Sequence, residues 1–315
     1  MSKGKWGESF LKSGLPLEHL TQVTFHTLGW DCNSQVEYSR RNRENQETWF
    51  ELDLTATFPK SNRDTELSFL IECKYHDLSR FWFFLPHEPS RWHFNDRVLN
   101  CAPLQTLKKP SLRTMLDLAP ASTGGIVVSE DGAKQDNAAY TAIQQLVNGY
   151  VPCSLSQMFS YNIDFHNVLT PEDELDFVPH ITALIPMIVT NASIYRLRPD
   201  VIDLEIIREA SAPSDIANEI EWTWCYHDPS MSLFDQNMET VEAHKAKEAE
   251  LVYRFPFVEN WMYDFANRPN WIAIVNIKAL SKVATIVAET FMSLDTHSVK
   301  YILNAKPRKR RKSQQ

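Results

Sequence analysis

Several features that separate classes of protein are missing from this chain of 315 residues. No apolar run approaches the length of about 18 residues that spans a membrane, and the first residues lack the apolar segment of a signal peptide. The five cysteines are scattered and contain no Cys-x-x-Cys spacing, which argues against both a disulfide framework and a structural zinc site. No internal repeat is present. We therefore expect a soluble cytoplasmic protein in a reducing compartment, without a membrane partner.

Positive charge is also scarce. The formal net charge is −8, and segment 306–312 alone carries six basic side chains. The rest of the chain keeps 26 basic against 40 acidic residues, which argues against an evenly basic surface for a polyanion. Phosphate contacts would have to come from local groups in a loop near residue 41, at 108–109 and in the tail. The candidates are Arg40, Arg41, Arg43, Lys108, Lys109, Lys306, Arg308, Lys309, Arg310, Arg311 and Lys312. The tail also fits a nuclear-localisation signal.

The most informative part of the chain is a pair of predicted strands. Segments 49–57 and 67–75 are rich in aromatic, Thr, Ile and Leu residues, and segment 59–64 between them carries turn chemistry. The midpoint between Asp53 and Glu72 falls inside that turn. A symmetric antiparallel hairpin therefore sets the two carboxylates directly opposite each other, with Cβ atoms about 5 Å apart.

Alternation along these strands sorts the side chains onto two faces. Glu51 and Asp53 share one face with Glu72 and Lys74. The residues expected to face a core are Phe50, Leu52, Leu54, Phe69, Ile71 and Cys73. Opposed carboxylates do not both stay ionised without a cation. Oxygen ligands without a nearby Cys or His pair favour Mg²⁺ or Mn²⁺, and Lys74 can then orient the attacking water or neutralise charge on a phosphate.

These motifs resemble the PD-(D/E)xK, or restriction-endonuclease-like, nuclease superfamily, in which a helix precedes a β-hairpin bearing an acidic residue and an acid-x-lysine pair. Here segment 13–18 opens a helix with proline in its first turn, and Gly29 ends it. The phrase is similar to the SG-aromatic-PLE opening of uncharacterised bacterial members near the Mrr-type and Holliday-junction-resolvase branches. In those branches a glutamate on this helix supports the metal. The resemblance assigns that role to Glu18, and Glu8, in a less clearly helical stretch, is the rival.

The downstream elements continue the resemblance more sparsely. Segment 134–146 is typical of an amphipathic helix with small residues for close packing on a sheet. A strand and turn are predicted over 185–192, and a strand over 271–276 leads into a helix over 278–292. In some relatives a glutamine on the second helix contacts the scissile phosphate, which makes Gln144 a candidate, although surface glutamines are common.

The resemblance is dense over 13–78 and extends through 134–192 and 270–292. It implies an α/β, restriction-endonuclease-like core with insertions, in which helices flank a mixed central sheet. We expect one elaborated domain over 1–305 and a basic disordered tail over 306–315.

Several other segments have both a structural and a functional interpretation. His76 follows the lysine closely and lies either near the metal or in a structural position. The aromatic run 81–85 could stack bases, but a continuous apolar run is more often buried. Segment 238–251 has the pattern of an exposed helix, and 171–178 and 211–220 have the composition of connecting loops.

The resemblance predicts a Mg²⁺- or Mn²⁺-dependent endonuclease that hydrolyses DNA in bacterial or phage DNA processing or defence. Glu18, Asp53 and Glu72 would bind or support the metal, and Lys74 would position the nucleophile. The expected partners are DNA and either a second copy of the chain or a larger defence or repair complex. Two alternatives remain open: a noncatalytic nucleic-acid-binding or assembly protein with the same fold, and a ribonuclease.

Overall fold

The computed structural model describes most of the chain. The described residues are 5–41, 47–59, 65–77, 79–87, 100–102, 115–129, 138–161, 181–228, 230–254, 259, 262–263, 265–266 and 269–293. The predicted turn at 60–64, the loop at 171–178, Arg43, Lys108, Lys109 and the tail from Lys306 onward lie outside these residues.

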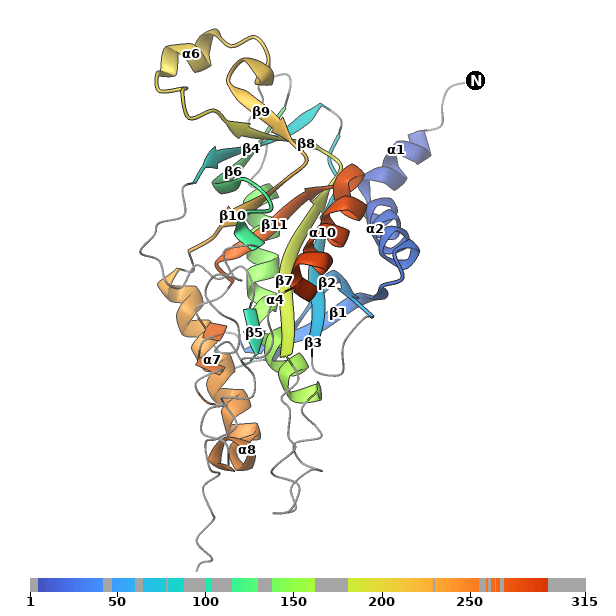
Figure 1. Cartoon of the computed structure of the whole chain (residues 1–315), viewed down its shortest axis with the longest axis vertical. Helices are drawn as coiled ribbons and strands as arrows, with labels where there is room; N and C mark the ends of the chain where they lie inside the picture. The colour runs from blue at the N-terminus through green and yellow to red at the C-terminus, as the bar shows by residue number, and fades with distance from the viewer. Residues whose placement is uncertain are drawn as a thin grey trace, which may run out of the picture.

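A single mixed sheet of 11 strands organises the described residues (Figure 1). Its strands are β1 (Asp31–Arg41), β2 (Glu47–Thr57), β3 (Thr65–Lys74), β4 (Arg80–Pro86), β5 (Asn100–Ala102), β6 (Ala121–Ser129), β7 (Ile181–Thr190), β8 (Ser193–Leu197), β9 (Ala217–Ile220), β10 (Trp222–Tyr226) and β11 (Trp271–Asn276). They are ordered β1-β2-β3-β7-β11-β10-β6-β4-β8-β9, and β5 pairs with β7. Strands β3, β7 and β11 are parallel neighbours at the centre.

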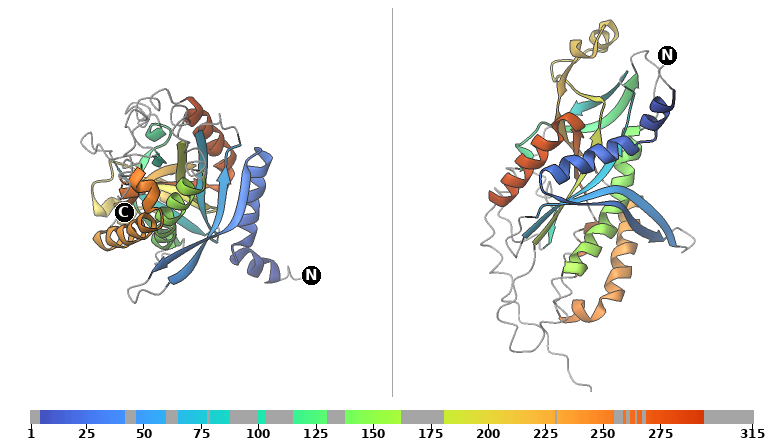
Figure 2. Two further views of the ribbon diagram at one scale, coloured as in Figure 1. Left: turned by 90° about the horizontal axis from the view of Figure 1, so that it is seen from below. Right: turned by 90° about the vertical axis from the view of Figure 1, so that its right-hand side faces the viewer.

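Helices cover both faces of the sheet (Figures 1 and 2). The helices are α1 (Lys5–Lys12), α2 (Leu15–Thr27), α4 (Ala138–Tyr161), α6 (Leu204–Glu209), α7 (Met231–Lys247), α8 (Ala249–Arg254) and α10 (Leu280–Ser293), with short 3-10 turns η3 (Pro213–Asp215) and η4 (Ile277–Ala279). Helices α2 and α10 pack on one face, whereas α4 and α7 pack on the other. The coarse prediction, an α/β protein with a mixed sheet flanked by helices, is confirmed. No helix among the described residues has the length and apolar character needed to cross a bilayer.

The β2–β3 hairpin has the predicted register. Leu54 pairs with Ile71 and Thr57 pairs with Ser68 in an antiparallel ladder. Carried one residue further, the same register sets Asp53 across from Glu72. The ladder itself ends at the Leu54 pair, because from this point the Asp53 side chain takes over a backbone hydrogen bond, as described below.

The structure corrects the predicted faces of β2. Leu52 packs in the core under α4, whereas Leu54 packs in the opposite core under α2. Phe50 is 44% exposed and stacks on Tyr38. Beside this change of face, Gln35 of β1 lies across from Asp53 in the register and has a φ of 58°. This left-handed region is uncommon for a residue other than glycine.

Two parallel strand pairs follow one another beside this hairpin. Strand β3 pairs with β7 in parallel, and the strands that follow them in the chain, β4 and β8, also pair in parallel. Asn191, in the connection from β7 to β8, binds the connection from β3 to β4. Its Oδ1 accepts a hydrogen bond from the His76 backbone N–H at 2.7 Å, and its Nδ2 donates to the His76 carbonyl at 2.7 Å. The chain segment just after Lys74 is therefore held firmly to the end of β7.

Most later predictions are confirmed in kind. Of the predicted helix over 134–146, residues 134–137 lie outside the described residues, and α4 runs from 138 to well beyond 146. Strand β7 covers the predicted strand with an earlier start, β11 has the predicted bounds, and α10, preceded by η4, occupies the predicted last helix. The predicted loop at 211–220 is wrong in part, because it contains η3 and β9. The run 81–85 is not continuously buried: it alternates, with Trp82 and Phe84 inside and Leu85 exposed. Residues of 238–251 are helical, and Val241 among them is buried under α4.

Candidate active site

The predicted carboxylates and lysine lie on three elements that contact one another, β3, β2 and α2. Glu72 and Lys74 lie near the end of β3, Asp53 lies on β2, and Glu18 lies in the first turn of α2. The charge of Asp53 raises the pKa of both Glu18 and Glu72, and Lys74 acts electrostatically on all three carboxyl groups. The structure therefore brings the four predicted residues into one electrostatic cluster.

Glu72 is the most deeply buried of the four, with 2% of its surface exposed. Its Oε1 accepts a hydrogen bond from Lys74 Nζ at 2.5 Å. Its Oε2 is buried and has no hydrogen-bond partner among the described residues. Burial raises the pKa of Glu72 to about 7; the charge of Asp53 adds to the rise, and Lys74 opposes it. An unpartnered buried carboxylate oxygen is costly unless something completes its coordination.

Asp53 is anchored by the backbone of the neighbouring strand. Its Oδ2 accepts a hydrogen bond from the Cys73 backbone N–H at 2.6 Å. Burial raises the pKa of Asp53, while this hydrogen bond and the charge of Lys74 lower it. The backbone donor thus fixes one Asp53 oxygen beside Glu72. This anchor leaves no signal in the sequence, because any residue except proline at position 73 supplies the same N–H.

Glu18 faces the same cluster from α2. Gly14 precedes the helix with a φ of 85°, and Pro16 occupies its first turn. A Cβ added at Gly14 would lie 3.4 Å from Glu18 Oε1, so the glutamate folds back over the helix start. Burial raises the pKa of Glu18, followed by the charges of Asp53 and Glu51. The rival, Glu8, lies in α1, which corrects the expectation of weaker helical character there, and its side chain is exposed.

The donor set fits a hard divalent cation. All candidate ligand atoms are carboxylate oxygens, which Mg²⁺ and Mn²⁺ prefer, and the unpartnered Glu72 Oε2 offers a free ligand atom. The charge of Asp53 raises the pKa of Glu18 and of Glu72, and Glu18 adds to the rise at Glu72; a cation relieves that repulsion. The ligand atoms are not grouped as in a formed metal site: within the described ranges, no three His, Cys, Asp or Glu side chains form such a group.

The predicted supporting residues take different positions. Glu51 is exposed on β2. His76 is buried against Trp82, and neither of its ring nitrogens has a hydrogen-bond partner among the described residues. Burial lowers the pKa of His76 to about 4, helped by the charges of Arg80 and Lys74, so its ring is neutral at pH 7. Gln144 is half-buried on α4, and its phosphate contact stays a prediction.

The loop predicted for Arg40 and Arg41 is wrong, because both residues belong to strand β1. Arg40 is buried, and its guanidinium bonds inside the protein. Its Nε donates to the Asn148 carbonyl at 2.6 Å, and its Nη2 donates to Asn237 Oδ1 at 2.7 Å. A third, longer bond of 3.4 Å reaches Gln236 Oε1. These bonds join β1 to α4 and α7, so Arg40 serves the fold in this structure.

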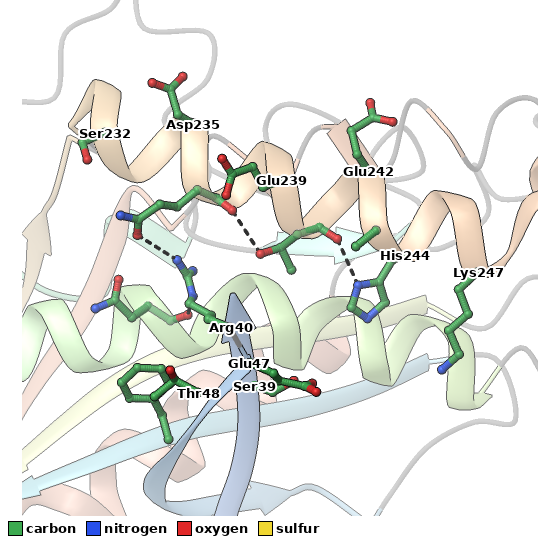
Figure 3. A pocket seen from close by; sticks show the side chains of 15 residues that line it. Ser39, Arg40, Glu47, Thr48, Ser232, Asp235, Glu239, Glu242, His244 and Lys247 are labelled. Atoms are coloured by element: carbon green, nitrogen blue, oxygen red, sulfur yellow. Dashed lines mark hydrogen bonds between the residues drawn. The ribbon is translucent and has the colours of Figure 1, made fainter. Parts of the chain in front are cut away.

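Arg40 lies on the floor of a cavity of about 1240 Å³ between the β1–β2 hairpin and α7 (Figure 3). The acidic residues of its wall are Glu47, Asp235, Glu239 and Glu242. None of the four predicted active-site residues lines it. An acidic wall repels phosphate, so this cavity and the carboxylate cluster are separate features.

Comparison of the chain with protein-family models, with curated proteins and with solved structures found no match.

Proposed function

We propose that this chain is a metal-dependent nuclease with a restriction-endonuclease-like fold that hydrolyses phosphodiester bonds in DNA. The observation that carries the proposal is the state of Glu72: its Oε1 accepts a hydrogen bond from Lys74, and its Oε2 is buried beside Asp53 with no hydrogen-bond partner among the described residues. A purely structural buried carboxylate has its oxygens satisfied. A carboxylate that binds a cation leaves one oxygen free for it.

The roles follow from the geometry of the cluster. Asp53 and Glu72 would hold Mg²⁺ or Mn²⁺, with Glu18 supporting from α2, and the ion would supply charge neutralisation at the phosphate and a more acidic bound water. The Cys73 N–H fixes the Asp53 carboxylate in place. Lys74 bonds Glu72 with one of its three ammonium protons. The remaining two can hold an attacking water or a phosphate oxygen.

The order of elements also supports the proposal. A helix (α2) precedes an antiparallel hairpin (β2–β3) that bears the acidic residues, and after the additional strands β4–β6 a helix (α4) and a central parallel strand (β7) follow. With β4–β6 taken as an insertion, this is the order that the sequence resemblance implies. Neighbouring strands β3 and β7 lie at the centre of the sheet, where a rigid scaffold holds the side chains of a site in place.

The experiment is a cleavage assay on plasmid, linear, branched and single-stranded DNA, and on RNA, with and without Mg²⁺. We expect Mg²⁺-dependent cleavage of DNA that Glu72→Gln abolishes. Glu66→Gln is the matched control, because Glu66 is a buried glutamate six residues earlier on the same strand. Absence of cleavage of every substrate in Mg²⁺ and Mn²⁺, or full activity of Glu72→Gln, contradicts the proposal. Cleavage of RNA alone indicates a ribonuclease.

Lys74 gives a second test of the same chemistry. Lys74→Ala should abolish turnover while metal affinity changes little, because the lysine is not a metal ligand. Lys74→Arg should not restore activity, since a guanidinium differs in shape and does not readily lose a proton. Turnover and calorimetric metal titration are measured on the same preparations. An active Lys74→Arg variant would remove the assigned role of this side chain.

One observation favours a noncatalytic role. Among the described residues, the ligand atoms are not grouped as in a formed metal site. A binding or assembly protein that keeps the fold would share this property. Isothermal titration with Mg²⁺ and Mn²⁺ separates the two functions: wild-type protein should bind either ion, and Asp53→Asn should bind it more weakly. Nucleic-acid binding without any metal binding would favour the noncatalytic role.

A further inference from the structure

The first two helices carry an apolar surface that the fold of one chain leaves uncovered. We call it the α1–α2 face, and its residues, all between 41% and 76% exposed, are Trp6, Phe10, Leu11, Leu15, Leu20 and Val23. No residue from Trp6 to Lys12 is buried. Helix α1 contacts α2, and both lie on the outside of the molecule (Figure 2). Exposed apolar side chains gathered on two contacting helices are typical of an interaction site.

Helix α2 also carries apolar residues outside its core-facing side. Leu17 and Phe25 face the sheet and belong to its core. Leu15, Leu20 and Val23 are exposed on the rest of the helix surface, among polar residues. A surface helix ordinarily has a single apolar stripe, which faces the core, and a polar opposite side. These three apolar side chains are therefore not part of the core of one chain.

The formal charge of the α1–α2 face favours a second copy of the same chain as its binding partner. Segment 5–28 contains two lysines and two glutamates and is formally neutral, whereas the whole chain has a formal net charge of −8. Two copies of an acidic protein repel each other least where their surfaces are neutral. A neutral face gives no attraction for nucleic acid or for an anionic membrane.

We propose that the α1–α2 face is the interface of a homodimer, in which the helix pair of one chain packs on the helix pair of a second copy. The six apolar side chains expose on the order of 600 Å², compared with about 800 Å² that each partner buries in an interface of standard size. A two-fold axis needs only one self-complementary patch. Large aromatic residues such as Trp6 and Phe10 are typical interface anchors. The proposal does not rest on the nuclease function.

The test is sedimentation velocity of the full chain over a concentration series into the high-micromolar range. We expect a concentration-dependent dimer. The double variant Trp6→Glu/Phe10→Glu should weaken dimerisation by about 100-fold or more, because it places two charges at the centre of the interface. Both residues are exposed, so the variant should fold, and far-ultraviolet circular dichroism with thermal unfolding checks this.

The matched control places the same charges on other exposed apolar residues. Ile202→Glu/Leu204→Glu alters side chains near α6 that are 89% and 76% exposed, and its dimer should match the wild type. A milder variant, Leu20→Ala/Val23→Ala, should weaken the dimer by a smaller factor. Wild-type protein that stays monomeric throughout the series overturns the proposal. A dimer broken by the α6 control and not by Trp6→Glu/Phe10→Glu, or a monomer that sediments with vesicles of anionic lipid, also overturns it.

Discussion

At the scale of single residues, Glu72 is under two opposing influences. Its burial beside Asp53 favours the protonated form, and Lys74 favours the ionised form. The pKa of about 7 that results places its ionisation in the range where many proteins function. Proton and cation then compete for the same carboxylate, because each relieves the repulsion from Asp53.

The stability of the metal-free protein should therefore depend on pH through Glu72. The folded-state pKa of about 7 lies above the ordinary value of 4.5, so the folded state binds the proton more tightly than the unfolded state. The stabilising contribution is full below about pH 4.5 and is lost as pH rises through about 7. Relative to wild type, Glu72→Gln should gain about 1–3 kcal/mol between pH 5 and pH 8. Urea unfolding in a chelator at both pH values measures this, and an unchanged difference contradicts it.

Because the Cys73 N–H donates to Asp53, two substitutions at Asp53 should have different effects on the free energy of unfolding. Asp53→Asn keeps an acceptor for this donor and removes the repulsion from Glu72, so the free energy of unfolding should hold or rise. Asp53→Ala leaves the donor without its partner and should cost about 1–3 kcal/mol. Both should lose cleavage activity under the proposed function. Urea unfolding at pH 7 compares them, and equal stabilities would show that the hydrogen bond contributes little.

At the scale of elements, the structural use of Arg40 is the main departure from the sequence-based expectation. We predict that Arg40→Ala costs about 2–4 kcal/mol, because it removes three hydrogen bonds from a charged donor and leaves buried acceptors on α4 and α7 unpartnered. Arg208→Ala is the control: Arg208 is exposed and pairs with Glu205 within α6, so its loss should stay within about 0.5 kcal/mol. Urea unfolding checks both, and a fully stable Arg40→Ala would contradict the structural role.

Local patterns predicted the β2–β3 hairpin well because its register depends on residues close in sequence. The turn composition and the alternation near Asp53 and Glu72 were sufficient to oppose the two carboxylates. The surroundings of Arg40 were not predictable in this way, since its partners lie 108 to 197 positions further along the chain. The change of face between Leu52 and Leu54 also escaped prediction, because strict alternation along a strand places both residues on one face, whereas they pack in opposite cores.

At the scale of the whole molecule, charge is distributed unevenly. Acidic residues outnumber basic ones by 40 to 32, and six of the basic ones lie in segment 306–312. Since Arg40 is engaged within the fold, the tail becomes the main remaining candidate for nonspecific phosphate contacts.

Truncation after Asn304 should therefore flatten the salt dependence of nucleic-acid binding. Each lost phosphate contact lowers the slope of log affinity against log salt by about 0.9, so the loss of three contacts lowers it by about 2.7. Fluorescence anisotropy at several salt concentrations measures the slope for both proteins. Cleavage of saturating substrate should persist under the proposed function. Equal slopes would indicate that the phosphate contacts lie elsewhere on the chain.

The position of β11 affects how the chain reaches this structure. It is the last strand in sequence, yet it lies between β7 and β10 near the middle of the sheet. Strands β3 and β7, which form the frame of the carboxylate cluster, are also joined only after more than a hundred intervening residues. Such non-local pairing slows folding and prolongs the exposure of unpaired strand edges. During synthesis the sheet stays divided until residue 276 has been made, so the growing chain should depend on chaperones to a degree that its final core does not suggest.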